Sequence, residues 1–166
     1  MMYAMAAVME GPLADLRAWK PTHCSIARAL EIVGTRSALL LMREAYYGTT
    51  RFDGFAERVG VTEAVAAKQL RKLVEHGLLE KQPYREEGQR TRHEYVLTQM
   101  GRDLLPVILA LWQWGDKYQQ DDGVPLLLVE DSTGSPVNVQ IRSAAGSEVG
   151  LEDIRVRVNR DAYLSR

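Results

Sequence analysis

The sequence predicts a mainly α-helical fold with a small β component (α+β), and three observations predict it. Apolar residues recur at helical spacing through most of residues 12–118, with Gly or Pro at the breaks. Two short helical stretches in the middle are joined by a glycine turn and followed by two strand-like stretches. After residue 120 the chain changes to β-branched runs separated by turns rich in Gly, Ser and Asp.

Length and composition indicate one globular domain with a small appendage, since the chain has 166 residues, of which 46% are hydrophobic and 26% charged. We expect a leader with a dimerisation helix (1–23), a central domain (24–120) and a three-stranded β extension (121–166). No apolar run approaches the roughly 18 residues needed to span a bilayer, and the start of the chain lacks the basic region of a signal peptide. We therefore expect a cytoplasmic protein that makes no membrane contact.

Charge is unevenly distributed along a chain whose net charge is only −1. Residues 36–92 hold eleven Lys and Arg against eight Asp and Glu, which leaves +3, whereas residues 119–166 hold five against eight, which leaves −3. An electropositive middle can contact phosphates although the whole chain is slightly acidic.

The N-terminal third is predicted to form short helices. Residues 12–19 begin with Pro and place Leu13, Leu16 and Trp19 on one side, a face that packs equally well on a second subunit or on its own chain. A helix over residues 25–33 follows, and Thr35 caps the next. The positions of 25–33 expected to face inward are Ile26, Ala29, Leu30 and Val33.

The centre of the chain has the spacing of a helix-turn-helix. Only Gly60 and Val61 separate a short helix over residues 51–59 from a helix over 62–76 that Thr62 caps. One face of the second helix is apolar (Ala66, Leu70, Leu73), and the opposite face is small and cationic (Ala64, Ala67, Lys68, Arg71). Small residues let a helix approach another surface closely, and long cations reach phosphates or base edges beside it. This pattern is typical of a winged helix-turn-helix that presents a recognition helix to DNA.

Two strand candidates, residues 78–84 and 92–98, follow the recognition helix. The turn between them, residues 85–92, carries Arg85, Gln89, Arg90 and Arg92, the residue types of a wing that contacts backbone or minor groove. A solvated charged hairpin is the alternative.

Thr98 caps a long helix that runs to about residue 118, which Pro106 should bend or restart. Its apolar positions leave little of the helix circumference polar. A dimer interface is the simplest use of the apolar surface that one small domain does not bury. A cavity for a small-molecule effector and ordinary core packing are alternative uses. The dimer-interface candidates here are Leu105, Ile108, Leu109 and Trp112. Beyond it, residues 124–130, 136–143 and 154–159 predict a three-stranded meander too small to be stable alone.

Residues 24–115 resemble the HxlR-type winged-helix regulators of bacteria. The resemblance rests on Cys24, the pair Arg51–Phe52, GVT followed by LRKLVEHGLL, Tyr84, EY-LT at residues 94–98, Gly101, LLP at 104–106 and WG at 114–115. It implies a homodimeric transcriptional regulator, which we expect to be a repressor, whose terminal helices form the dimer and whose 62–76 helix enters the major groove of a pseudo-palindromic operator. The residues expected to contact DNA are Arg51, Thr62, Glu63, Ala64, Ala67, Lys68, Arg71, Lys72, Arg85, Gln89, Arg90 and Arg92.

The chain departs from the family at several places. Members often carry Lys or Arg where Ala64 stands and Leu where Ala66 stands, and many have a shorter wing, so the operator sequence is open. The tail resembles an extension of some actinobacterial members in which cysteine pairs suggest a zinc ribbon. Here it contains no Cys or His, so we expect no metal.

Cys24 is a redox candidate, because a helix N-terminus with His23 and Arg28 nearby favours the thiolate and lowers the pKa. In several members the matching cysteine senses oxidants or electrophiles, whereas a small buried hydrophobe is the alternative role. Members often have Pro after this cysteine, where Ser25 stands here.

Catalysis has little support, since the sequence contains no G-x-S-x-G, no Gly-rich phosphate loop and no H-E-x-x-H. We expect neither an enzyme nor a bound cofactor. The alternative to DNA binding is a winged-helix module that contacts proteins through its acidic extension.

Overall fold

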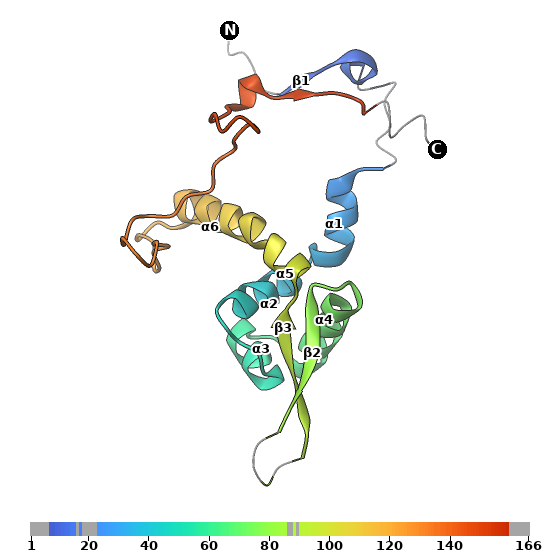
Figure 1. Cartoon of the computed structure of the whole chain (residues 1–166), viewed down its shortest axis with the longest axis vertical. Helices are drawn as coiled ribbons and strands as arrows, with labels where there is room; N and C mark the ends of the chain where they lie inside the picture. The colour runs from blue at the N-terminus through green and yellow to red at the C-terminus, as the bar shows by residue number, and fades with distance from the viewer. Residues whose placement is uncertain (1–6, 16, 18–22, 86–87, 89, 160–166) are drawn as a thin grey trace. The chain divides into compact units, whose positions relative to one another are not determined.

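The computed structural model describes residues 7–15, 17, 23–85, 88 and 90–159 (Figure 1). The chain divides into two compact units, one formed by Met1–His23 with Gln140–Arg166 and the other by Cys24–Val139. We call them the terminal unit and the winged-helix unit. The elements of the winged-helix unit are α1 (Ser25–Val33), α2 (Arg36–Tyr46), α3 (Phe52–Val59), α4 (Glu63–Glu75), β2 (Leu79–Tyr84), β3 (Arg92–Leu97), α5 (Gln99–Asp103) and α6 (Leu105–Gln119).

Helix α2 lies at the centre of the winged-helix unit, where it contacts α1, α3, α4, α6 and β3. Its Leu41 and Met42 are fully buried and pack with Phe55 of α3 and with Leu70 and Leu73 of α4. Burying side chains of this size stabilises a fold by roughly 1.5–3 kcal/mol each. One apolar core therefore positions α3 and α4 relative to each other.

Threonine caps begin three of the helices, as the sequence predicts. The hydroxyls of Thr35, Thr62 and Thr98 accept the backbone N–H three residues later at 3.1, 3.3 and 3.1 Å. Each bond satisfies one of the donors that a helix start leaves free.

Strands β2 and β3 form an antiparallel hairpin that pairs Leu79 with Leu97 at its base and Tyr84 with Arg92 at its outer end. Figure 1 shows both strands running away from the helices. The inner end is anchored in the core through Leu79 and Tyr95, whose side chains are buried.

The helical stretch after Thr98 is divided before Pro106, as expected, because α5 ends at Asp103 and α6 begins at Leu105. Helix α5 approaches the residue before β2 so closely that a Cβ at Gly101 would lie 2.2 Å from the carbonyl oxygen of Leu78. Glycine is therefore required where the chain turns from the hairpin into α6.

The inward face predicted for residues 25–33 is wrong in most positions. Val33 is buried, but Ala29 is exposed and the side chains of Ile26 and Leu30 are 72% and 55% exposed. Helical periodicity identifies an apolar face without showing what covers it, and within the winged-helix unit only the C-terminal end of α1 reaches the core.

The three-stranded meander predicted for residues 121–166 is not formed in the described part of the chain. Residues 128–137 form an irregular hairpin with a single bridge between Val129 and Pro136, and a second bridge joins Arg142 and Glu148. Pro136 has no N–H to extend the ladder, and most side chains of these runs are exposed, so no shared core holds three strands together.

In the terminal unit, the last run forms only a two-residue strand, β4 (Arg155–Val156), which pairs in parallel with β1 (Val8–Met9). The Glu10 carboxylate lies 3.8 Å from the Arg155 guanidinium and 2.5 Å from that of Arg157, which adds an ion pair to the short ladder. The helix predicted over residues 12–19 is a single 3-10 turn, Gly11–Ala14, as far as the described residues extend.

Candidate nucleic-acid interface

The turn between α3 and α4 is built by Gly60. Its backbone is left-handed, with φ +68°, and its N–H donates to the carbonyls of Ala56 and Glu57 at 3.1 Å each. A residue with a Cβ is strained in this conformation. The glycine lets the chain reverse within three residues, so α4 begins at Glu63 directly against α3.

Helix α4 buries one face and leaves the other open. Ala66, Leu70 and Leu73 have no exposed surface. The side chains on the opposite side are exposed, with Ala67 half-buried, and they include Thr62, Glu63, Ala64, Lys68 and Arg71. This outer face is narrow at the alanines and cationic toward the C-terminal half, as predicted.

Lys72 differs from the other predicted contacts. Its ammonium group donates to the backbone carbonyl of Glu31 near the end of α1, and its side chain is half-buried. This bond joins α4 to α1 and directs Lys72 away from the outer face, so we assign it to packing.

The hairpin supplies a second group of cations. Arg85, Arg90 and Arg92 are exposed near its outer end, while Gln89 lies outside the described residues. The Arg51 guanidinium at the start of α3 lies 4.6 Å from the ring centroid of Tyr84, a cation–π contact. Arg51, Arg92 and His93 also line a polar hollow of about 290 Å³ beside α3. Sequence analysis did not identify Tyr84 or His93 as part of this site.

A buried carboxylate connects α2 to α3. Glu44 is 2% exposed and accepts from Arg43 at 2.6 Å and from Arg58 of α3 at 2.5 Å. Burial acts to raise the pKa of Glu44, but the hydrogen bonds and charges of Arg58 and Arg43 outweigh it and hold the pKa below its ordinary value. Helical periodicity does not reveal this pair, because Glu44 and Arg58 are 14 residues apart in different helices.

The Arg71 side chain also lies close enough to β3 to affect Tyr95. Burial raises the pKa of the Tyr95 hydroxyl, and the positive charge of Arg71 opposes that shift. Tyr95 itself packs edge-on against Phe55 with ring centroids 6.0 Å apart. The inner end of the hairpin and the cationic end of α4 therefore share one supporting core.

The dimer-interface candidates occupy different environments. Leu13 and Ile108 are buried in their own units, Leu105, Leu109 and Trp112 are half-buried, and Leu16 and Trp19 lie outside the described residues. The exposed apolar face of α6 is a different one, formed at i, i+4, i+7 and i+11 by Val107, Leu111, Trp114 and Tyr118, each between 49% and 57% exposed.

Cys24 occupies the N-cap position of α1, as predicted, with a half-buried side chain that makes no capping bond. In the described ranges, no group of three or more His, Cys, Asp or Glu side chains is placed to hold a metal ion. No helix of the described residues is long and apolar enough to cross a bilayer.

Two helices joined by a glycine turn and followed by an antiparallel hairpin define a winged helix-turn-helix, the class of domain that presents one helix to the major groove. The chain belongs to the HxlR-like helix-turn-helix family, whose sequence profile matches residues 32–122. It is thus a member of a family of DNA-binding transcriptional regulators.

Relatives of known sequence and structure support this membership. The uncharacterized HTH-type transcriptional regulator Rv3095 of Mycobacterium tuberculosis is 39% identical over 132 residues, which cover 78% of this chain and 82% of the relative. PA1607, a protein proposed to be a transcription factor, has a crystal structure with a TM-score of 0.73 and 37% identity over 84% of this chain and 96% of that one. The redox regulator HypR has a TM-score of 0.53 and 26% identity over 58% of this chain and 95% of that one.

Proposed function

We propose that this protein is a homodimeric repressor that inserts the outer face of α4 into the major groove of a pseudo-palindromic operator. The observation that carries the proposal is the α4 outer face, which stays exposed although the opposite face is fully buried. Ala64 and Ala67 allow close approach, Lys68 and Arg71 reach base edges or phosphates, and Thr62 and Glu63 lie at the entering end. A regulator of this kind works in the cytoplasm, where bacterial DNA lies.

The wing is proposed to contact the DNA backbone or the minor groove beside α4. Arg85, Arg90 and Arg92 are exposed there, and Arg51 on the Tyr84 ring extends the same cationic surface to the start of α3. Phosphate contacts of this kind set the position of a protein on DNA without reading its sequence.

Dimerisation is proposed to use the exposed apolar faces of α6 and α1. Val107, Leu111 and Trp114 of α6 are exposed together with Ile26 and Leu30 of α1. Figure 1 shows α1 and α6 toward the end of the winged-helix unit opposite the wing. A dimer formed there leaves both copies of α4 free, and its twofold symmetry predicts half-sites about one or two helical turns apart.

Control of DNA binding is proposed to come from a small effector or from oxidation of Cys24. Cys24 lies at the N-cap position of α1, and its side chain is partly exposed. HypR, a structural neighbour, is a redox regulator. Loss of operator binding on treatment with diamide, retained in a Cys24→Ser protein, is the expected result of the redox route.

Selection of binding sites from random oligonucleotides with the purified chain tests the main proposal. We expect a palindromic motif, and we expect Arg71→Ala to reduce discrimination against mismatched bases by about 1–3 kcal/mol at one position of each half-site. Lys72→Ala is the matched control on the same helix, because its ammonium group faces α1, and it should leave the motif unchanged.

The wing makes a separate contribution in the same assay. Arg92→Ala should weaken binding to all DNA sequences alike and reduce the slope of log affinity against log salt concentration by about 1. Salt-independent binding, or an unchanged motif in the Arg71→Ala protein, contradicts the proposal. Partner binding that survives Lys68→Ala/Arg71→Ala but requires residues 121–166 would instead favour the protein-interaction module.

A further inference from the structure

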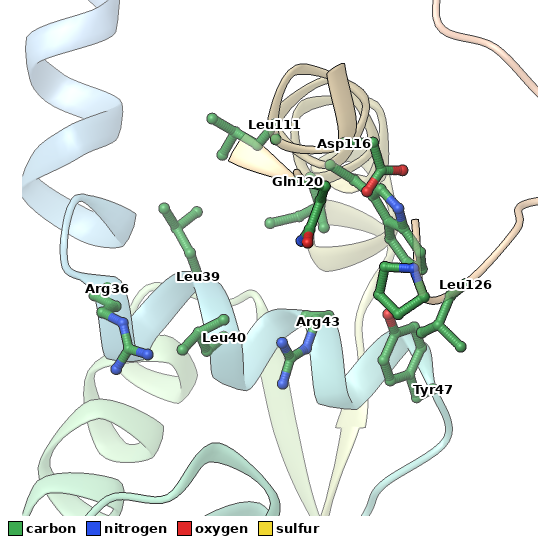
Figure 2. Close-up of a pocket in the computed structure, with 13 residues that line it drawn as sticks. Arg36, Leu39, Leu40, Arg43, Tyr47, Leu111, Asp116, Gln120 and Leu126 are labelled. Atoms are coloured by element: carbon green, nitrogen blue, oxygen red, sulfur yellow. The ribbon is translucent and has the colours of Figure 1, made fainter. Parts of the chain in front are cut away.

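The winged-helix unit contains a pocket that the DNA-binding elements do not use. It lies between α2 and α6 and has a volume of about 530 Å³ (Figure 2). Small-molecule sites typically measure about 300–1,000 Å³ and are lined mostly by apolar groups with a few polar ones. The apolar walls here come from Leu39 and Leu40 of α2, Leu111 and Trp112 of α6, and Leu126 of the following segment.

The segment after α6 is attached over this pocket by one glutamine. The Gln113 amide donates to the Asn138 side chain at 3.0 Å, and its oxygen accepts from the Val139 N–H at 2.9 Å. The backbone of 128–137 closes into a hairpin through bonds such as Val137 N–H to the Leu128 carbonyl. Because both ends of residues 120–139 are held to α6, Pro125 and Leu126 form one wall of the pocket.

The polar groups of the pocket favour an anion. Arg36 and Arg43 of α2, Asp116 of α6 and Gln120, which directly follows α6, line the pocket, and Figure 2 shows Gln120 pointing toward α2. Two arginines and one aspartate line the pocket, which leaves a local charge of +1, and the Glu44–Arg58 ion pair beside Arg43 adds no net charge. Low-dielectric walls strengthen the attraction of such a charge for a ligand.

Arg43 is held in a fixed orientation on the pocket wall. Its Nε and Nη2 donate to Glu44 at 3.0 and 2.6 Å, and its guanidinium lies 5.8 Å from the Tyr47 ring centroid. Tyr47 in turn packs edge-on against Trp112, with ring centroids 6.2 Å apart. These bonds use two of the five N–H donors of Arg43, and the others can donate to an anion.

We propose that this pocket binds a small organic anion with an aromatic body, and that the anion is the effector of DNA binding. The body packs between Leu40 and Trp112, and the anionic group accepts from Arg36 and Arg43. Glu44 joins Arg43 to Arg58 of α3, so an anion that competes for Arg43 changes the link that positions the helix-turn-helix. The binding step stands alone, whereas the effector role rests on the proposed function.

A matched pair of fluorescent probes tests the binding step on the purified full chain. 8-Anilinonaphthalene-1-sulfonate carries an anion, and N-phenyl-1-naphthylamine has the same rings without it. We expect saturable binding of the sulfonate at one site per chain and about tenfold weaker binding in an Arg36→Gln protein, the usual effect of losing a hydrogen bond to a charged group. The affinity of the neutral probe should change less than twofold.

Gly115→Leu identifies the site. A Cβ at Gly115 meets no heavy atom within 4 Å, so the new side chain fills open pocket space without a clash. This variant should abolish binding of both probes, whereas Gln119→Leu, which adds the same apolar group at an exposed position outside the pocket, should not. Three results would each overturn the proposal. They are unchanged binding in Gly115→Leu, equal losses of both probes in Arg36→Gln, and no binding of either probe because the second copy of the chain fills the pocket.

Operator affinity measured with and without saturating sulfonate probe tests the effector role. We expect at least a fivefold change in the wild-type protein and none in Gly115→Leu. An unchanged affinity refutes the effector role while leaving the binding step established. If the protein binds no DNA at all, the proposed function is refuted instead. Probe binding by the chain without DNA then shows whether the binding step still holds.

Discussion

Helices α4 and α6 have similar lengths, and both leave a large face outside the core, but the exposed faces differ in chemistry. The outer face of α4 carries alanines beside Lys68 and Arg71, and water or phosphate groups can solvate or pair with these two charges. The outer face of α6 carries Leu111 and Trp114, both more than a third exposed, which water solvates poorly. The comparison indicates a polar, charged partner for α4 and an apolar partner for α6.

Placing charge on the α6 face should have the largest effect. Val107→Glu/Trp114→Glu puts two carboxylates where an apolar partner would leave them desolvated and unpaired. We expect the dimer dissociation constant to rise on the order of 100-fold or more, which corresponds to about 2.7 kcal/mol. Sedimentation equilibrium measures it directly.

The corresponding change on α4 serves as the control. Lys68→Glu introduces the same charge on an exposed helical face, and it should abolish operator binding while the dimer persists. If the two variants affect assembly equally, or if the double variant remains dimeric, the assignment of α6 to the subunit interface is wrong.

Neutralising the buried carboxylate that joins α2 to α3 should have an intermediate effect. Glu44→Gln removes the charge that Arg43 and Arg58 pair with, and since both cations are partly solvated we expect a loss of about 1–2 kcal/mol at pH 7. The folded-state pKa of Glu44 is lowered, so its contribution is complete above its ordinary value of 4.5 and is lost as pH falls through the folded value.

Urea unfolding at several pH values measures this contribution. The difference between wild type and Glu44→Gln should shrink as the pH drops below 4.5. Glu57→Gln on the exposed side of α3 should change stability by no more than about 0.5 kcal/mol at any pH. A pH-independent difference would show that Glu44 acts through packing and not through its charge.

Local signals made the α4 side of the comparison predictable. A threonine cap, a glycine turn and a two-faced helix lie within residues 60–76, and the structure places Thr62, Gly60 and Arg71 as expected. The bond that Lys72 makes to α1 was not predicted, because its partner, Glu31, lies 41 residues earlier in the sequence. Spacing within one helix does not show which cation another element captures.

The α6 side was less predictable for a physical reason. Apolar residues surround most of this helix, so its periodicity does not distinguish the core face from the open face, and the predicted interface included Ile108, which the chain buries itself. A cavity beside this helix was one of the alternatives, but its polar residues were not predicted, because the pocket brings Arg36 and Arg43 together with Leu126, more than 80 residues later. Only the irregular segment after α6 creates that contact.

Removing the hydroxyl that anchors α5 to α2 should have the smallest effect. Tyr46 donates to the carbonyl of Gly101, and burial together with the charge of Asp103 raises the pKa of Tyr46 to about 12. Tyr46→Phe should cost about 1 kcal/mol at neutral pH, the usual contribution of one hydrogen bond. Because the pKa is raised, wild-type stability should hold below the ordinary value of 10 and fall as pH rises through 12, and the variant should lack this loss.

Tyr46→Phe weakens the attachment of α5, which leads into α6, while it leaves the exposed side chains of α6 unchanged. Thermal unfolding between neutral pH and pH 12 measures the effect, with exposed Tyr118→Phe as the control that should stay within about 0.5 kcal/mol. Dimer dissociation should change little in Tyr46→Phe, because the open α6 face is intact. If the dimer weakens as much as it does with Val107→Glu/Trp114→Glu, the orientation of α6 on α2, and not its apolar surface, governs assembly.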